Sequence, residues 1–152
     1  MWFHKLISTS LGIGYINNGK GAGTVAAVAC SFCWYFAWRN GYQPVPALII
    51  TVLITFIGVW SSGIVAGIWG KDPAKVVIDE VAGMCISLLF IPVSVKYVLP
   101  ALILFRFFDM VKPLYIKKVE KFPGGWGIMF DDVLAGIYAN ILMQAVLWFR
   151  LF

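Results

Sequence analysis

Long apolar stretches separated by short polar segments divide this chain of 152 residues. A helix needs about 20 mostly apolar residues to cross the ~30 Å hydrocarbon core of a bilayer. The stretches 22–38, 45–69 and 133–149 approach or exceed this length and are predicted to be membrane helices. The acidic pair Asp131 and Asp132 would then stand directly before the last of them.

The apolar region 76–108 is too long for one helix and is interrupted by Pro92, Lys96 and Pro100. Basic residues decide between one span and two, because Lys and Arg gather on the cytoplasmic side of membrane proteins. Two short spans that turn near 92–96 place every basic cluster inside. The sequence thus predicts an all-α fold: an integral membrane bundle of about five helices, the third and fourth short, in a single domain covering 1–152.

Composition supports a membrane protein, since 61% of the residues are hydrophobic, 12% are charged and the mean hydropathy is +0.88. A soluble domain of this size has too little interior to bury so much apolar surface. The three cysteines lie in apolar stretches and the chain has one histidine, which is too few ligands for a zinc site. We interpret the cysteines as buried thiols and expect neither a cleaved signal peptide nor a nucleic-acid partner.

The predicted topology brings most of the acidic residues to one membrane boundary. Six of the seven fall at the cytoplasmic ends of three helices: Asp72, Asp79, Glu80, Asp109, Asp131 and Asp132. Only Lys and Arg were used to choose the topology, so this convergence is an independent result.

Two acidic motifs, VIDEVAGM at 77–84 and FDDVLAG at 130–136, resemble each other. At four-residue spacing each begins a line on one helix face: Asp79, Gly83 and Ser87, and Asp132, Gly136, Asn140 and Gln144. Small and polar residues in one stripe are typical of close packing between membrane helices. We therefore expect the two lines to be packing seams that bring the acidic pairs together.

The acidic pairs have two interpretations, helix capping or metal binding. Two like charges ~4 Å apart repel by about 4 kcal/mol near a protein surface, so four converging carboxylates favour a shared divalent cation. A donor set of oxygens alone suits Mg²⁺, with Mn²⁺ as a substitute. The expected metal ligands are Asp79, Glu80, Asp109, Asp131 and Asp132.

Basic residues near these acids are candidate phosphate ligands. Arg106, Asp109 and Lys112 recur every third residue and can line one helix face, either as a local ion pair with a membrane anchor or as a phosphate site. Lys20 stands in a glycine-rich segment whose backbone N–H groups could approach an anion, although its glycines would equally serve helix packing. A nucleotide-binding P-loop is excluded, because Gly21 occupies the Ser/Thr position.

Carboxylates and cations at a membrane surface indicate phosphoryl chemistry on a lipid head group, with water as the nucleophile. A histidine-nucleophile phosphatase is excluded by the single histidine. One alternative is a head-group transferase with CMP-linked substrates, but its Asp-Gly-x-x-Ala-Arg signature is missing. The other is a small divalent-cation carrier, which would place carboxylates near the middle of the membrane.

Three segments, KDPAKVVIDEVAGM, FRFFDMVKP and GGWGIMFDDVLAG, occur in this order and together resemble the phosphatidylglycerophosphatase A family. The similarity runs from about Gly12 to near the C-terminus. It implies an all-helical, Mg²⁺-dependent lipid phosphatase of the bacterial inner membrane. Such an enzyme hydrolyses phosphatidylglycerophosphate to phosphatidylglycerol and inorganic phosphate, with its site facing the cytoplasm.

The resemblance and the residue pattern together assign roles. Catalytic roles are expected for Asp72, Asp79, Glu80 and Asp132, and substrate binding for Arg106, Lys112, Lys20 and Thr24. Asp72 could also cap a helix that starts at Pro73. Expected partners are the phosphatidylglycerophosphate substrate and anionic membrane lipids, and the sequence is compatible with a homo-oligomer.

Overall fold

The structure, a computed structural model, describes residues 1–71 and 73–152, and these residues form helices without a β-strand. The elements in chain order are α1 (Trp2–Ser8), the 3₁₀ segment η1 (Ile13–Gly19), α2 (Ala22–Trp38), α3 (Pro44–Trp69), α4 (Ile78–Leu88), α5 (Val95–Val111), α6 (Ile116–Val119) and α7 (Gly125–Trp148). The all-α prediction is confirmed.

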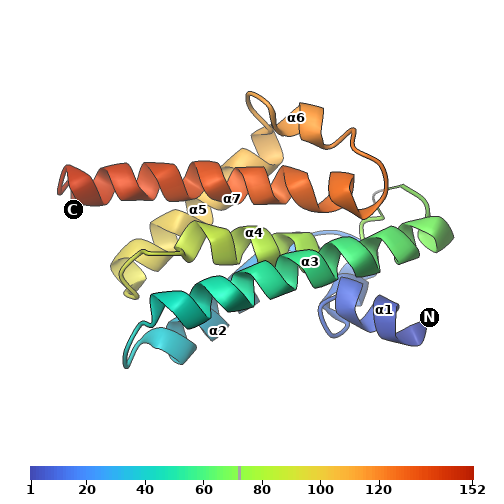
Figure 1. Cartoon of the computed structure of the whole chain (residues 1–152), viewed down its shortest axis with the longest axis horizontal. Helices are drawn as coiled ribbons and strands as arrows, with labels where there is room; N and C mark the ends of the chain where they lie inside the picture. The colour runs from blue at the N-terminus through green and yellow to red at the C-terminus, as the bar shows by residue number, and fades with distance from the viewer. Residues whose placement is uncertain (72) are drawn as a thin grey trace.

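Helix α4 lies at the centre of the molecule and contacts α2, α3, α5 and α7. Helices α3, α4 and α7 run along the long axis, and α1 lies at the end of the molecule opposite the C-terminus (Figure 1). The connection between α3 and α4 lies at the same end as α1. The first turns of α4 and α7 are therefore brought to one end of the bundle.

The apolar stretches form helices close to the predicted ranges. Helices α2 and α3 cover 22–38 and 44–69, and the region after residue 76 forms two helices whose connection, 89–94, contains Pro92. Pro100, predicted to be an interruption, lies inside α5. Helices α3 and α7 are long and apolar enough to cross a membrane, and α2 is a shorter apolar helix. These helices favour a membrane bundle, and the number of five membrane helices stays a prediction.

The predicted start of the last helix, near Val133, is wrong. Helix α7 begins at Gly125, so Asp131 and Asp132 lie in its second turn rather than before it. The local reason is the pair of glycines at its start. Gly124 has a φ of 61°, which glycine adopts without strain, and a Cβ at Gly125 would overlap the carbonyl oxygen of Val59 in α3.

The two predicted packing seams meet between α4 and α7. A Cβ at Gly83 would lie 2.6 Å from the carbonyl oxygen of Asp132, and one at Gly136 would overlap the Gly83 carbonyl oxygen. The hydroxyl of Ser87 donates to the Gly83 carbonyl at 2.9 Å and lies 3.5 Å from that of Gly136. Because the missing side chains allow the backbones to touch, the acids at the head of each seam are held close together.

Further along α7, Asn140 completes the seam. Its Nδ2 donates to the carbonyl oxygens of Ile86, Ser87 and Leu89 at 3.1, 3.1 and 2.7 Å, where α4 ends. Gln144 donates to the carbonyl of Phe90 at 3.3 Å. Carbonyl groups at the end of α4 and just after it are therefore bound by side chains of α7.

The cysteines lie near the centre of the bundle. Cys30 of α2 and Cys85 of α4 are buried, with their sulfur atoms 3.5 Å apart, as the sequence predicted. Cys33 is exposed, which corrects the prediction for that residue, because it lies on the face of α2 that borders an open apolar groove.

Candidate active site

A polar cavity of about 320 Å³ lies at the end of the bundle where α4 and α7 begin. Five acidic and two basic side chains line it, contributed by α4, α5, the residue that caps α5, and α7: Asp79, Glu80, Asp109, Asp131, Asp132, Arg106 and Lys112. The other lining residues are small or apolar and come from η1, the start of α2 and the segment 73–77. Seven predicted site residues thus converge on one cavity.

The carboxylates form two groups that share Asp132. Oxygen atoms of Asp79, Asp131 and Asp132 all lie within 4.8 Å of one another, and so do those of Glu80, Asp109 and Asp132. Three of these side chains are buried, with 8%, 5% and 2% of Asp79, Asp131 and Asp132 exposed. Acids from three helices are therefore close enough to hold a shared cation.

The two acidic pairs have the same local geometry. Oδ1 of Asp79 accepts a hydrogen bond from the backbone N–H of Glu80 at 3.0 Å, and Oδ1 of Asp131 accepts one from that of Asp132 at 2.9 Å. The first pair also lies in the first turn of α4, where the helix dipole favours negative charge. The pair in α7 lacks this support, since it lies a turn further into its helix.

Arg106 joins the acid of α4 to the acid of its own helix. Its Nη1 donates to Oε2 of Glu80 at 2.6 Å and to Oδ2 of Asp109 at 2.5 Å. Its Nε is buried and has no hydrogen-bond partner among the described residues. The guanidinium group is therefore fixed by two carboxylates and keeps one N–H available for a ligand.

Lys112 binds an acid of α7. It caps the C-terminus of α5 with a φ of 50°, and its Nζ donates to Oδ2 of Asp131 at 2.9 Å and lies 3.3 Å from Oε1 of Glu120. Partial burial lowers the pKa of Lys112, but the hydrogen bond and charge of Asp131, with Glu120, more than offset this and hold it above its ordinary value. Lys112 is therefore a permanent cation at neutral pH.

The acids at the site exceed its bases, and one carboxylate oxygen is left open. Five carboxylates face two basic groups, which leaves three negative charges when all are ionised. Oδ2 of Asp132 is buried and has no hydrogen-bond partner among the described residues. A buried, unpaired carboxylate oxygen is costly, and a cation satisfies it. The donor set contains only oxygen, which fits a hard divalent ion rather than a thiolate-bound metal.

The sequence comparison agrees with this geometry. The family model of phosphatidylglycerophosphatase A matches residues 6–147. The chain belongs to the phosphatidylglycerophosphatase A family. This places the three acidic and basic motifs within one family domain that covers nearly the whole chain.

Several curated relatives are similar to this member of the family. A Bacteroides thetaiotaomicron protein provisionally named phosphatidylinositol-3-phosphatase is 42% identical, over 94% of this chain and 92% of that protein. The phosphatidylglycerophosphatases A of Haemophilus influenzae and Escherichia coli are 41% and 32% identical, over 68% and 76% of this chain and 66% and 67% of their own. No solved structure matches the chain.

The remaining predicted residues lie away from the cavity or outside the description. Lys20 and Thr24 are exposed and do not line the cavity, whereas Gly19, Gly21 and Gly23 around them do. A Cβ at Gly23 would overlap the carboxylate of Glu80, so this turn contributes space rather than charge. Asp72 lies outside the described residues. The segment 73–77 forms no helix, so the predicted helix start at Pro73 is wrong.

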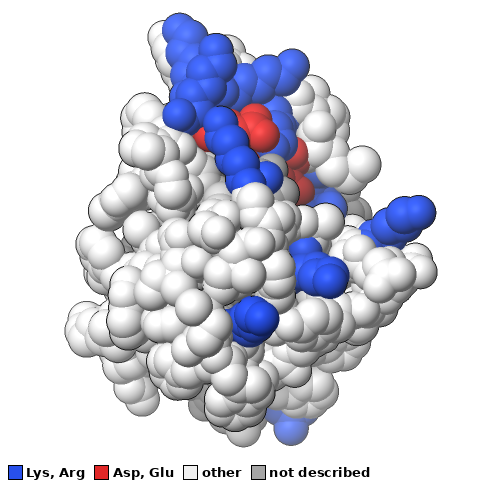
Figure 2. Space-filling model, turned by 90° about the vertical axis from the view of Figure 1, so that its right-hand side faces the viewer, with Lys and Arg blue, Asp and Glu red and all other residues white. Residues whose placement is uncertain are grey.

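One residue near the site, Glu120, had no clear signal in the sequence. Glu120, the seventh acidic residue, lies beside Lys112 because α6 folds back onto α7. A second cavity, of about 470 Å³, is lined by Lys71, Lys117 and Lys121 together with the start of α7. Viewed from this end, Lys and Arg side chains surround the acidic ones (Figure 2). The acidic site is thus framed by a basic rim.

Proposed function

We propose that the chain is a lipid phosphatase that hydrolyses phosphatidylglycerophosphate to phosphatidylglycerol and inorganic phosphate with the aid of Mg²⁺. The observation that carries the proposal is the arrangement of two clusters of carboxylates that share Asp132, with Arg106 and Lys112 beside them. The names of the relatives from Haemophilus influenzae and Escherichia coli support the choice of substrate.

The acidic residues would hold the metal. Asp79, Asp131 and Asp132 form one candidate set, and Glu80, Asp109 and Asp132 the other, so the arrangement suits one or two ions. When bound, a divalent cation polarises the phosphoryl group and makes water a better nucleophile at neutral pH. In the reaction the oxygen of water bonds to phosphorus, the ester P–O bond breaks, and the glycerol oxygen takes up a proton.

The basic residues of this chain bind and orient the phosphate. Arg106 offers its free Nε–H from a guanidinium group fixed by Glu80 and Asp109. Lys112 adds a second positive charge on the Asp131 side of the cavity. Donors held in place by neighbouring carboxylates need no reorganisation when charge develops on the phosphoryl oxygens, which is how fixed donors lower a barrier.

The proposed enzyme is a single domain that crosses the bacterial inner membrane several times. Helices α3 and α7 have the required length and composition, and the acidic cavity lies at the end with the basic rim. Because Lys and Arg favour the cytoplasmic side, this end would face the cytoplasm. There the rim would also attract anionic membrane lipids.

One relative favours a second candidate substrate. The name of the Bacteroides thetaiotaomicron protein specifies a phosphate on the inositol ring of a lipid. Phosphatidylinositol 3-phosphate and phosphatidylglycerophosphate both present a phosphate monoester on a lipid head group. The carboxylates and the two basic side chains of the cavity would contact this shared phosphate group. The two substrates would therefore differ only in how their alcohol part fits the cavity.

The test is phosphate release by the purified protein in detergent, with each of the two lipids as substrate. We expect Mg²⁺-dependent release from phosphatidylglycerophosphate, abolished by a chelator and restored by added Mg²⁺ or Mn²⁺. Faster release from phosphatidylinositol 3-phosphate would replace the substrate and keep the reaction. Release from neither lipid, by protein that is folded by circular dichroism, would refute the proposed phosphatase.

The same preparation tests the two alternative functions. A divalent-cation carrier would move Mn²⁺ into sealed liposomes without releasing phosphate. A head-group transferase would consume a CMP-linked lipid and release CMP. We expect no transport, because the carboxylates surround a cavity at one end of the bundle instead of a path along it. We expect no transfer either, because the transferase signature is missing from the sequence.

A further inference from the structure

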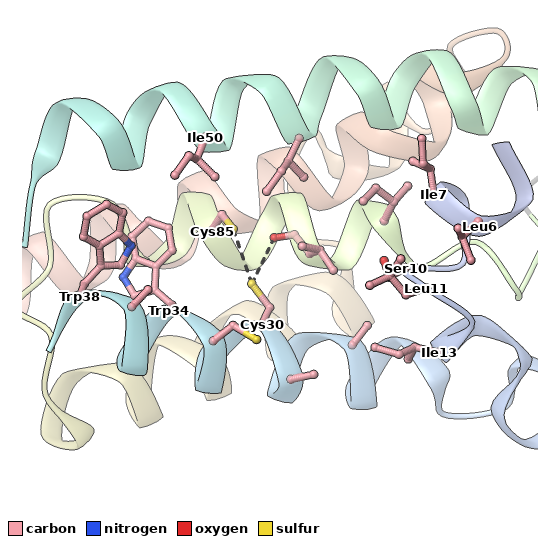
Figure 3. Close-up of a pocket in the computed structure, with 17 residues that line it drawn as sticks. Leu6, Ile7, Ser10, Leu11, Ile13, Cys30, Trp34, Trp38, Ile50 and Cys85 are labelled. Carbon is pink, nitrogen blue, oxygen red and sulfur yellow. Dashed lines mark hydrogen bonds between the residues drawn. The ribbon is translucent and has the colours of Figure 1, made fainter. Parts of the chain in front are cut away.

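An apolar groove of about 490 Å³ runs between α2 and α3. These helices are consecutive in the chain but stand apart, and α4 forms the floor between them (Figure 3). The wall on one side includes Ala29, Cys33 and Ala37 of α2, and the other includes Ile50 and Ile54 of α3. The lining is almost entirely apolar, which makes the groove a candidate for a hydrocarbon ligand.

The groove and the acidic cavity share their elements. On α4, Glu80 lines the cavity and the next residue, Val81, lines the groove. On α2, Gly23 lines the cavity and Ala26, one turn later, lines the groove. Ala26, which lines the groove, and Val77, which lines the cavity, belong to one buried cluster together with Ala22. A ligand with a phosphate and a hydrocarbon tail could therefore occupy both spaces from one position.

The two ends of the groove differ in a way that suits a lipid. Leu6, Ser10, Leu11 and Ile13 lie at the end nearest the acidic cavity, and Trp34 and Trp38 lie at the far end (Figure 3). The Oγ of Ser10 is buried and has no hydrogen-bond partner among the described residues. A polar atom near the head-group end, followed by apolar lining, matches the order of groups in a glycerolipid.

Length points to one acyl chain. At about 1.5 Å per residue, the wall from Ala26 to Trp38 is roughly 18 Å long. The acyl chains of one leaflet occupy half of the hydrocarbon core, about 15 Å. The groove is therefore long enough for one acyl chain of the leaflet that faces the acidic cavity, and too short for a helix that spans both leaflets.

We propose that this groove binds one acyl chain of the lipid whose phosphate enters the acidic cavity, an inference that rests on the proposed function. The chain leaves an apolar bilayer for an apolar groove, so little hydrophobic energy is gained. The groove instead positions the substrate: a tail held along α2 fixes where the head group lies relative to the carboxylates. Misplacement by about 1 Å can lower a rate a hundredfold.

The first test fills the groove. Ala37→Phe and Ala29→Phe place a ring between α2 and α3, and Ala145→Phe, on α7, adds the same group away from the groove. The measured quantity is the ratio of kcat/KM for a long-chain substrate to that for a water-soluble dibutanoyl one. We expect the groove variants to lower this ratio about tenfold or more and the α7 variant to keep the wild-type ratio. An unchanged ratio in folded Ala37→Phe protein would overturn the proposal.

A second test reads binding directly. A phosphatidylglycerophosphate carrying a photoreactive diazirine at the end of one acyl chain is cross-linked to the wild-type protein and mapped by mass spectrometry. We expect labelling near Trp34, Trp38 and Ile50 that excess unlabelled lipid removes. Labelling that is spread over the exposed faces of α3 and α5, and that excess unlabelled lipid does not remove, would overturn the proposal. Cross-links between two copies of the chain at the groove, in place of labelling by the lipid, would also overturn it. If no phosphate is released but the competed labelling is found, the proposed reaction fails and the groove assignment stands.

Discussion

Gly136 of α7 packs so closely against Gly83 of α4 that a Cβ on Gly136 would overlap the Gly83 carbonyl oxygen. This contact lies one turn beyond Asp132 and one turn beyond Asp79. The separation of the two helices at this point sets the distance between their carboxylates. Backbone packing and metal binding are therefore coupled.

The variant Gly136→Ala tests this coupling. The added methyl group forces α7 away from α4, and overpacking of this kind costs about 1–3 kcal/mol. We expect phosphatase activity to fall at least about tenfold as the carboxylates separate. Gly67→Ala is the matched control, because a Cβ there has open space, and it should be neutral or slightly stabilising. Normal activity and an unchanged melting temperature in Gly136→Ala would contradict the coupling.

Replacing Asp132 with Asn removes the carboxylate shared by both acidic groups. We expect activity to fall by about a hundredfold or more, since even residues that only support metal ligands cost 10–100-fold. Mg²⁺ at 100 times its Kd should stabilise the wild-type protein by about 2.7 kcal/mol and the variant far less, measured by thermal unfolding. Glu120→Gln, at the half-exposed edge of the site, is the control and should change activity only a few-fold. Equal stabilisation of wild type and Asp132→Asn by Mg²⁺ would remove this residue from the metal site.

The substitution Arg106→Lys keeps the charge and removes the planar group. An ammonium cannot bind Glu80 and Asp109 in the same fixed geometry and keep a separate planar N–H like the unpartnered Nε–H of Arg106. We expect kcat/KM to fall about tenfold, mainly through KM. The control is Arg39→Lys, whose guanidinium lies over the ring of Phe36. Kinetics of Arg106→Lys that match the wild type would show that the guanidinium geometry is not used.

The pH dependence of Lys112 follows from the sign of its pKa shift. A raised pKa means that the ammonium and its ion pair with Asp131 persist at every pH below the ordinary lysine value and are lost only as the pH rises further. The alkaline limb of the activity profile between about pH 7 and 10 should therefore not come from this group. Lys112→Arg, which cannot deprotonate in this range, should show the same alkaline limb. If the alkaline limb of the Lys112→Arg variant were displaced by a full pH unit, the loss of activity at high pH would be assigned to deprotonation of Lys112.

The sequence was sufficient to predict the seven charged residues that converge on the cavity. Four-residue spacing after Asp79 and Asp132 identified both seams, because small residues on membrane helices pack in stripes whatever surrounds them. The distribution of basic residues favoured two helices between 76 and 108, and α4 and α5 are found there. Both patterns are local and repeat along the chain, so the sequence alone is enough to identify them.

Other parts of the site depend on contacts between distant segments. Helix α7 starts at Gly125 because its backbone packs against Val59, a residue 66 positions earlier that no local pattern indicates. Lys20 was predicted to bind an anion from its glycine neighbours, but it is exposed and does not line the cavity. Which face of such a turn meets the site depends on η1, where Asn17 and Asn18 adopt left-handed conformations.

The amide of Asn140 has a consequence for how water reaches the interior. Helix α4 has eleven residues, about 16 Å, and ends beside buried Leu88, Leu89 and Ile91. Its last carbonyls would normally be hydrated, and here a single NH₂ group substitutes for the solvent. Helix α4 can thus end against buried apolar side chains, and its last carbonyl groups need no water molecules as hydrogen-bond partners.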